Sequence, residues 1–156
     1  MKRLIHLKVN GEPYEVAIHP HRTLAEVLRE ELDLIGTKEA CNQGDCGSCT
    51  VIIDGKTVTS CLTLAVEAEG KDIRTIEGEA KNGKLSPVQQ SFVDHGAIQC
   101  GFCTPGMVMS ATALLEQNPN PTEDEVRMGI AGNICRCTGY TKIVEAILAV
   151  SEGGKK

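Results

Sequence analysis

The sequence predicts an α+β protein in two parts, a small sheet with one helix across it followed by a bundle of four helices. In the first part, runs of alternating apolar and polar residues are typical of strands. After residue 84, apolar residues recur every three or four positions behind helix-capping motifs, which is typical of helices. The eight cysteines divide evenly, four in each part.

The composition is that of a globular protein, with 41% hydrophobic and 24% charged residues among 156. A net charge of -5 disfavours a nucleic-acid partner, which would require a basic face. No run of 18 apolar residues occurs, so we expect no membrane span. The N-terminus, MKRLIHLKVN, lacks the apolar region of a signal peptide, so we expect a reducing, cytoplasmic location unless a partner chain carries an export signal. Cysteines there serve as metal ligands or redox groups more often than as disulfides.

The first part begins with a predicted β-hairpin and a helix. Alternating residues over 5–9 and 14–18 flank Asn10-Gly11, a dipeptide typical of tight hairpin turns. A capping box opens a helix over 23–32, which ends before Gly36.

A cysteine-rich loop over 41–49 leads into the remaining strands. Residues 50–53 and 56–59 flank Asp54-Gly55, which predicts a second hairpin. A last short strand that includes 73–76 is expected, which completes a small sheet.

Residues 77–84, EGEAKNGK, are polar and small. They predict a linker between a first domain over 1–76 and a helical domain over 85–156. Four helices are expected in the second domain, from 86 to about 96, over 105–116, from 122 to about 130 and around 143–150.

The four cysteines of the first part, called the first set, follow the spacing of plant-type [2Fe–2S] proteins. Cys41, Cys46 and Cys49 form C-x4-C-x2-C, and Cys61 follows after eleven residues. A [2Fe–2S] centre needs four thiolates around a core larger than one ion, so a loop can supply three and a neighbouring strand the fourth. A zinc knuckle and a thioredoxin-like redox pair are the alternatives. The zinc alternative leaves Cys41 unexplained, and the spacing favours the cluster over both.

Two glycines lie between the cysteines of this loop. Gly44 and Gly47 permit a positive φ and let backbone N–H groups approach the sulfurs. Such donors would stabilise the reduced, more negative cluster and so tune its potential.

The four cysteines of the second part, called the second set, form two close pairs. Cys100 and Cys103 are separated by 31 residues from Cys135 and Cys137, enough for two helices to go out and back. Each pair can bind one iron of a second cluster. From spacing alone, a zinc site built from the same four thiolates is an equal alternative.

With both sets placed, the chain resembles the small iron–sulfur subunit of the molybdenum hydroxylases, the xanthine dehydrogenase family. The matching stretches are CNQGDCGSCTV, QCGFCTPGM and GNICRCTGYTKIV, in the family's order, and the similarity extends over about residues 3–150. The resemblance implies an N-terminal ferredoxin-like β-grasp domain and a C-terminal four-helix bundle. It also favours a [2Fe–2S] cluster over zinc at the second set.

The resemblance implies where each cluster lies in a larger complex. The second set would bind the cluster near a molybdopterin, and the first set the cluster nearer a flavin. Gln99, directly before Cys100, matches the residue that hydrogen-bonds the pterin in this family, and Cys137 lies in the same vicinity. A simple loop or helix-end hydrogen bond is the alternative for Gln99.

The implied protein is an oxidoreductase subunit with no catalytic residue of its own. The resemblance places the molybdopterin, as its cytosine dinucleotide, on a large subunit that oxidises the substrate, and FAD on a medium subunit. Single electrons would pass from molybdenum through the second cluster and then the first to FAD, in a dimer of heterotrimers.

Two other functions stay open from the sequence. A free-standing two-cluster ferredoxin fits the acidic charge, although 105–107 and 137–140 are expected to form docking surface. A zinc-stabilised binding module fits the number of cysteines.

Overall fold

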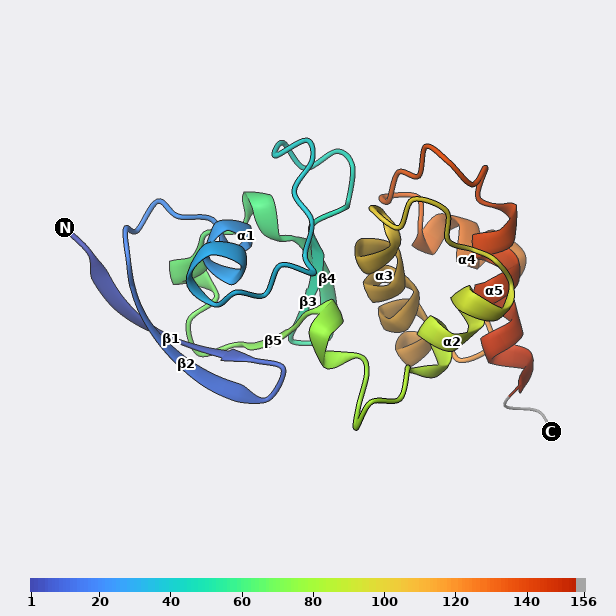
Figure 1. The fold of residues 1–156 in the computed structure, drawn as a ribbon, viewed down its shortest axis with the longest axis horizontal. Helices are drawn as coiled ribbons and strands as arrows, with labels where there is room; N and C mark the ends of the chain where they lie inside the picture. The colour runs from blue at the N-terminus through green and yellow to red at the C-terminus, as the bar shows by residue number, and fades with distance from the viewer. Residues whose placement is uncertain (154–156) are drawn as a thin grey trace.

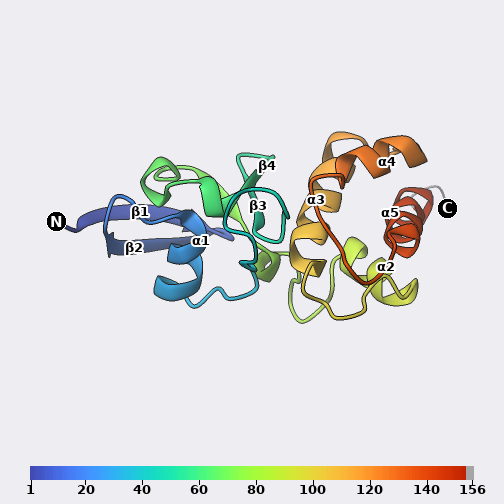
Figure 2. The same ribbon diagram turned by 90° about the horizontal axis from the view of Figure 1, so that it is seen from above.

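A computed structural model describes residues 1–153. The last three residues of the range predicted for the second domain, 154–156, lie outside the described part. Figures 1 and 2 show two lobes side by side, a sheet lobe that contains the N-terminus and a helical lobe that contains the C-terminal helix. Within the described residues, no helix is both long and apolar enough to cross a membrane.

The sheet lobe contains five strands in the order β2-β1-β5-β3-β4. β1 and β5 run parallel and the other neighbours antiparallel, so the sheet is mixed. Both predicted hairpins are confirmed, and the turn residues Asn10, Gly11, Asp54 and Gly55 all have positive φ, as tight hairpin turns require. The strands are β1 (Arg3–Val9), β2 (Glu12–Ile18), β3 (Thr50–Ile53), β4 (Lys56–Thr59) and β5 (Asp72–Arg74).

The helix of the sheet lobe begins at the predicted capping box. The Thr23 hydroxyl accepts from the Glu26 N–H (3.2 Å), and the Glu26 carboxylate accepts from the Thr23 N–H (2.8 Å). The α-helical part, α1 (Leu24–Glu26), is a single turn that continues as a π-helical turn over Val27–Glu31. Soon afterwards Asp33 has a φ of 57°, which is incompatible with a continuing helix. The helix predicted over 23–32 thus ends where expected, but it is α-helical only in its first turn and π-helical over Val27–Glu31.

The helical lobe contains four helices around one apolar core. α5 packs against α2 and α4, and α3 packs against α2 and α4. The capping boxes at Ser86 and Thr122 form as predicted. The helices are α2 (Pro87–Asp94), α3 (Thr104–Gln117), α4 (Glu123–Gly129) and α5 (Thr141–Gly153).

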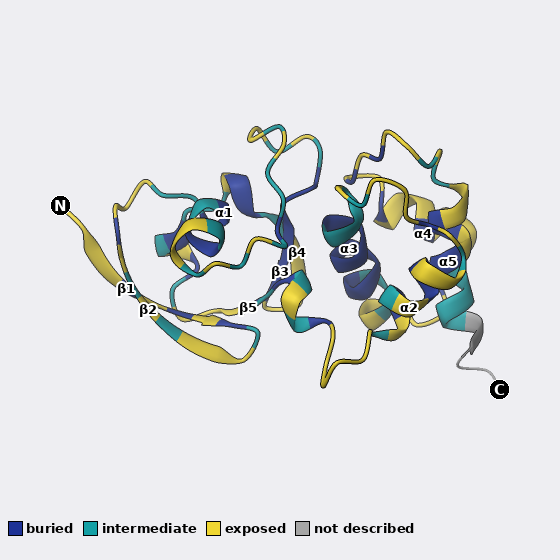
Figure 3. Ribbon diagram, in the orientation of Figure 1, coloured by how far each residue is buried: buried dark blue, intermediate teal, exposed yellow. Residues whose placement is uncertain are grey.

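Helix α3 lies between the sheet and the other helices, and it is the dark central helix in Figure 3. Every residue over 106–113 is buried, which is typical of a helix with protein on all sides. On one side Met107 joins the core of the helical lobe, and on the other Met109 and Ala113 pack against Ile52 of β3. The two lobes therefore share an apolar interface.

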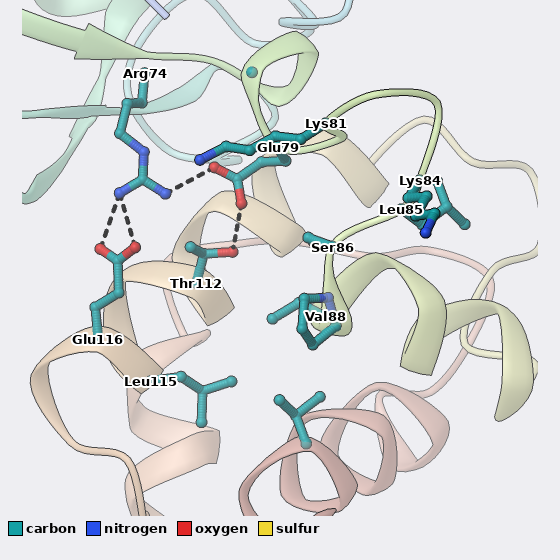
Figure 4. Close-up of a pocket in the computed structure, with 13 residues that line it drawn as sticks. Arg74, Glu79, Lys81, Lys84, Leu85, Ser86, Val88, Thr112, Leu115 and Glu116 are labelled. Atoms are coloured by element: carbon teal, nitrogen blue, oxygen red, sulfur yellow. Dashed lines mark hydrogen bonds and ion pairs between the residues drawn. The ribbon is translucent and has the colours of Figure 1, made fainter. Parts of the chain in front are cut away.

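The segment predicted as a polar linker also contributes to this interface. The Glu79 carboxylate is only 5% exposed, and it accepts hydrogen bonds from Arg74 of β5 (2.9 Å) and Thr112 of α3 (3.2 Å). Arg74 also pairs with Glu116 at 2.8 Å (Figure 4). Burial lowers the pKa of Arg74, but the two carboxylates outweigh it and raise the pKa above its ordinary value. These residues line a cavity of about 730 Å³ between the lobes.

Replacing Arg74 with alanine is expected to destabilise the protein by about 2 kcal/mol, below the roughly 3–5 kcal/mol of a fully buried pair because Arg74 is partly exposed. The loss arises because the buried Glu79 carboxylate keeps only Thr112 as a partner. Denaturant unfolding measures it. The matched control is Arg127→Ala, which removes a surface pair with Glu123 and should cost about 0.5 kcal/mol or less. Equal losses in the two variants would contradict the role of Arg74.

Candidate metal centres

The first set of cysteines lies at the end of the sheet lobe that faces α3. Cys49 directly precedes β3 and Cys61 follows β4, so the antiparallel pairing of these strands brings the two together. Ser60 strengthens this junction, since its N–H and its hydroxyl both donate to the Cys49 carbonyl (3.3 and 2.7 Å). Cys41 and Cys46 come from the loop and are partly exposed, whereas Cys49 and Cys61 are buried.

Backbone donors reach the sulfurs of this set. The N–H of Gln43 lowers the pKa of Cys41 to about 6, and the N–H of Cys46 adds to the effect at 3.4 Å from the Cys41 sulfur. Burial raises the pKa of Cys61 to about 11, with a further rise from the neighbouring Cys49 thiol. The backbone of Gly44, whose φ is 86°, opposes that rise. Gly44 thus has the positive φ and the approach to sulfur that its position in the sequence predicts.

The second set lies on two loops of the helical lobe. Cys100 and Cys103 precede α3, and Cys135 and Cys137 precede α5. The sulfurs of Cys137 and Cys100 are 3.6 Å apart, and this contact raises the pKa of Cys137. Burial raises the pKa of Cys103 to about 12, and the adjacent Cys135 thiol contributes. Each cysteine of one loop therefore faces a cysteine of the other.

Cys135 has its own hydrogen-bond donor. Burial acts to raise its pKa, but the Thr138 hydroxyl, 3.0 Å from the sulfur, and nearby backbone groups outweigh burial and lower it. The Tyr140 hydroxyl accepts the Cys135 N–H at 2.9 Å, which fixes the loop.

The donor sets suit [2Fe–2S] cores. All eight cysteines are free, and each lobe brings together the four that spacing predicted. Four thiolates are the ligands that such a core takes, and N–H and O–H donors toward sulfur stabilise its negative charge. Among residues 1–153, no three His, Cys, Asp or Glu side chains are arranged to hold a single metal ion.

The two cysteine loops touch each other through their backbones. The Cys46 carbonyl accepts the Ile134 N–H at 2.9 Å. Gly47 has a φ of 68°, and a Cβ there would lie 2.2 Å from the carbonyl oxygen of Gly132. A Cβ on Gly106 would lie 2.3 Å from the Gly47 carbonyl oxygen. Gly47 thus has the predicted positive φ. The close approach that requires a glycine here is between its backbone and the Gly132 carbonyl of the helical lobe.

The interpretation of 105–107 as docking surface is wrong. Gly106 and Met107 are buried, because Gly106 contacts the loop of the first set and Met107 fills the core of the helical lobe. In the second expected docking segment, 137–140, Cys137 and Gly139 are exposed and the other two residues are partly buried.

Gln99 lies at the exposed edge of the second set. It and Cys100 are both exposed. Apolar side chains beside it, Ile98 and Phe102, are 38% and 45% exposed. The structure thus presents Gln99 outward, and its contact with a pterin stays a prediction.

Comparisons with known proteins place both halves of the chain. Residues 7–79 match the model of a 2Fe-2S iron-sulfur cluster binding domain, and residues 75–148 match that of a [2Fe-2S] binding domain. The chain is 48% identical to the nicotinate dehydrogenase small FeS subunit of Eubacterium barkeri, over 94% of this chain and 93% of that protein. It is 52% identical to the xanthine dehydrogenase iron-sulfur-binding subunit of Escherichia coli O157:H7, over 92% and 91%.

Solved structures agree with these matches. A chain of quinoline 2-oxidoreductase from Pseudomonas putida 86 superposes with a TM-score of 0.95 at 49% identity, over 99% of this chain and 96% of that one. The aldehyde oxidoreductase from Desulfovibrio desulfuricans ATCC 27774 gives a TM-score of 0.93 at 41% identity, over 97% of this chain but 17% of that longer chain.

The fold and the two matched domains define an iron–sulfur protein with a ferredoxin-like α+β architecture. The chain belongs to the family of small [2Fe–2S] subunits of the molybdenum hydroxylases, the xanthine dehydrogenase family, and is an oxidoreductase subunit.

Proposed function

We propose that this chain is the electron-transfer subunit of a molybdenum hydroxylase complex and relays single electrons through two [2Fe–2S] clusters. The observation that carries the proposal is the presence of two sets of four thiols, one per lobe, on loops that are hydrogen-bonded to each other. The proposed ligands of the first cluster are Cys41, Cys46, Cys49 and Cys61, and those of the second are Cys100, Cys103, Cys135 and Cys137.

The chain's own residues set the conditions for this relay. Bound [2Fe–2S] clusters supply one-electron chemistry. Burial of Cys49, Cys61 and Cys135 keeps water from part of each site. The N–H groups near Cys41 and the Thr138 hydroxyl at Cys135 favour the more negative, reduced state and so raise each potential.

The exposed parts of each site support a proposed direction of transfer. Cys100, Cys137 and Gln99 are exposed at one edge of the helical lobe, where we place the molybdopterin of the large subunit. Leu62, next to Cys61, is 61% exposed, and we place the FAD-binding medium subunit on that side. Electrons then enter at the second cluster and leave from the first.

The finer assignments belong to the same proposal. We assign residues 1–76 to a β-grasp domain, 77–84 to a linker and 85–156 to a four-helix bundle, which is supported by the separate apolar cores of the two lobes. The complex would be a cytoplasmic dimer of heterotrimers whose pterin is the cytosine dinucleotide.

Purification of the chain with its partners from its native source tests the proposal. Two clusters require about four irons and four sulfides per chain and two EPR signals on reduction. Molybdenum and FAD should co-purify. A colourless protein with zinc would overturn the iron–sulfur assignment. Four irons in a chain that has no larger partner would instead identify a diffusible ferredoxin.

A further inference from the structure

A buried side chain connects the two cysteine loops. Asn133 lies two residues before Cys135 and is 4% exposed. Its amide nitrogen donates to the Gly47 carbonyl (2.9 Å) and, more weakly, to the Thr50 hydroxyl (3.3 Å), both in the sheet lobe. Its amide oxygen accepts from the Ser110 hydroxyl of α3 at 2.6 Å. One side chain thus holds the loop of the second set, the loop of the first set and the helix between them.

These hydrogen bonds act where the backbones already touch. Gly47 lies between Cys46 and Cys49, and its neighbour across the interface is Gly132. The Cys46 carbonyl and the Ile134 N–H form a direct hydrogen bond beside Asn133. A shift of Asn133 would therefore move a ligand loop of one set relative to a ligand loop of the other.

We propose that Asn133 is a positioning residue that fixes the separation and the hydrogen-bonded path between the two clusters. This inference rests on the proposed function. Both amide N–H groups and the amide oxygen are used, so the amide has one orientation with all partners satisfied. The rate of electron transfer between two centres falls steeply as their separation increases. It is therefore the property most sensitive to how the Asn133 amide holds the two loops. Among the described residues, the Asn133 amide hydrogen-bonds to Ser110, Gly47 and Thr50 and to no cysteine sulfur, so we expect each cluster to assemble without it.

The test replaces Asn133 with leucine in the intact complex. Leucine has a similar branched shape, adds no charge and makes none of the three hydrogen bonds. We expect both EPR signals and the full iron content to persist. The magnetic splitting between the two reduced clusters should decrease, and the rate of electron exchange between them after flash reduction should fall.

A milder variant and a matched control separate positioning from general stability. Ser110→Ala removes only the bond that anchors the Asn133 amide to α3, and it should reduce splitting and rate by less than Asn133→Leu. Ser91→Ala removes a comparable buried bond within the helical lobe, from the Ser91 hydroxyl of α2 to the Ala146 carbonyl of α5 at 2.6 Å. It should change neither measurement.

Three outcomes would overturn the inference. The first is that Asn133→Leu leaves both the splitting and the rate unchanged. The second is that Ser91→Ala changes them as much as Ser110→Ala does. The third applies if Asn133→Leu loses a cluster, and it is that Ser110→Ala leaves both values unchanged. The proposed function fails differently, since the unmodified complex would then lack two EPR signals.

Discussion

Replacing Cys137 with serine is expected to abolish the EPR signal of the second cluster and to leave the signal of the first. Iron in these clusters binds soft thiolates, and a serine hydroxyl that stays protonated near neutral pH is a poor substitute. Cys137 faces Cys100 at 3.6 Å in the second set, so its loss removes one of the four proposed ligands. Iron content should fall from about four to about two per chain.

In the same variant, substrate should no longer reduce the flavin. Substrate would still reduce the partner's molybdenum centre, but the electrons would have no second cluster through which to leave. Stopped-flow measurement in the complex should therefore show loss of substrate-dependent flavin reduction.

The reciprocal variant is the control. Cys41→Ser changes a partly exposed thiol of the first set and should remove the other EPR signal while keeping that of the second cluster. Retention of both signals in Cys137→Ser, or loss of the same signal in both variants, would refute the assignment of ligands to two sets.

Replacing Gly47 with alanine is expected to destabilise the protein by about 3 kcal/mol or more, because two costs add. An L side chain in left-handed backbone costs about 1–2 kcal/mol. The new Cβ would also lie 2.2 Å from the Gly132 carbonyl oxygen, which is backbone and cannot rotate away. The two loops must separate, so iron content should fall as well. Denaturant unfolding and iron analysis measure the two effects.

Gly70→Ala provides the matched control. Gly70 has a φ of 77°, similar to that of Gly47, but no atom lies within 4 Å of a Cβ built there. This variant should show only the backbone cost of about 1–2 kcal/mol and normal iron content. Equal losses at the two glycines would mean that the contact with Gly132 contributes nothing.

The sequence was most informative where the signals are local. The boundaries of β3 and β4 and the capping boxes at Ser86 and Thr122 agree with prediction, because a turn or cap depends on neighbouring residues. The grouping of the cysteines follows from their even division between the two parts and from the close spacing within each loop, and the structure brings each set together.

Contacts between the lobes could not be predicted in this way. Asn133 and Gly47 are 86 residues apart, and no periodicity links them. The sequence does not single out Asn133, although an amide two residues before Cys135 offers a weak signal. Glu79 lies in the segment predicted to be a polar linker. Its burial could not be predicted locally, because the buried carboxylate depends on hydrogen bonds from Arg74 and from Thr112, which is 33 residues away. The helix after Thr23 is predicted as regular, whereas Val27–Glu31 is π-helical, because apolar spacing alone does not distinguish the two types of turn.

The position of α3 limits how the two lobes can change independently. Met109 and Ala113 face Ile52, while Met107 faces the opposite core, so the helix belongs to both lobes at once. A chimaera joining the sheet lobe of one relative to the helical lobe of another would need matched volumes at these positions. Divergence along this helix should accordingly occur as compensating pairs of substitutions.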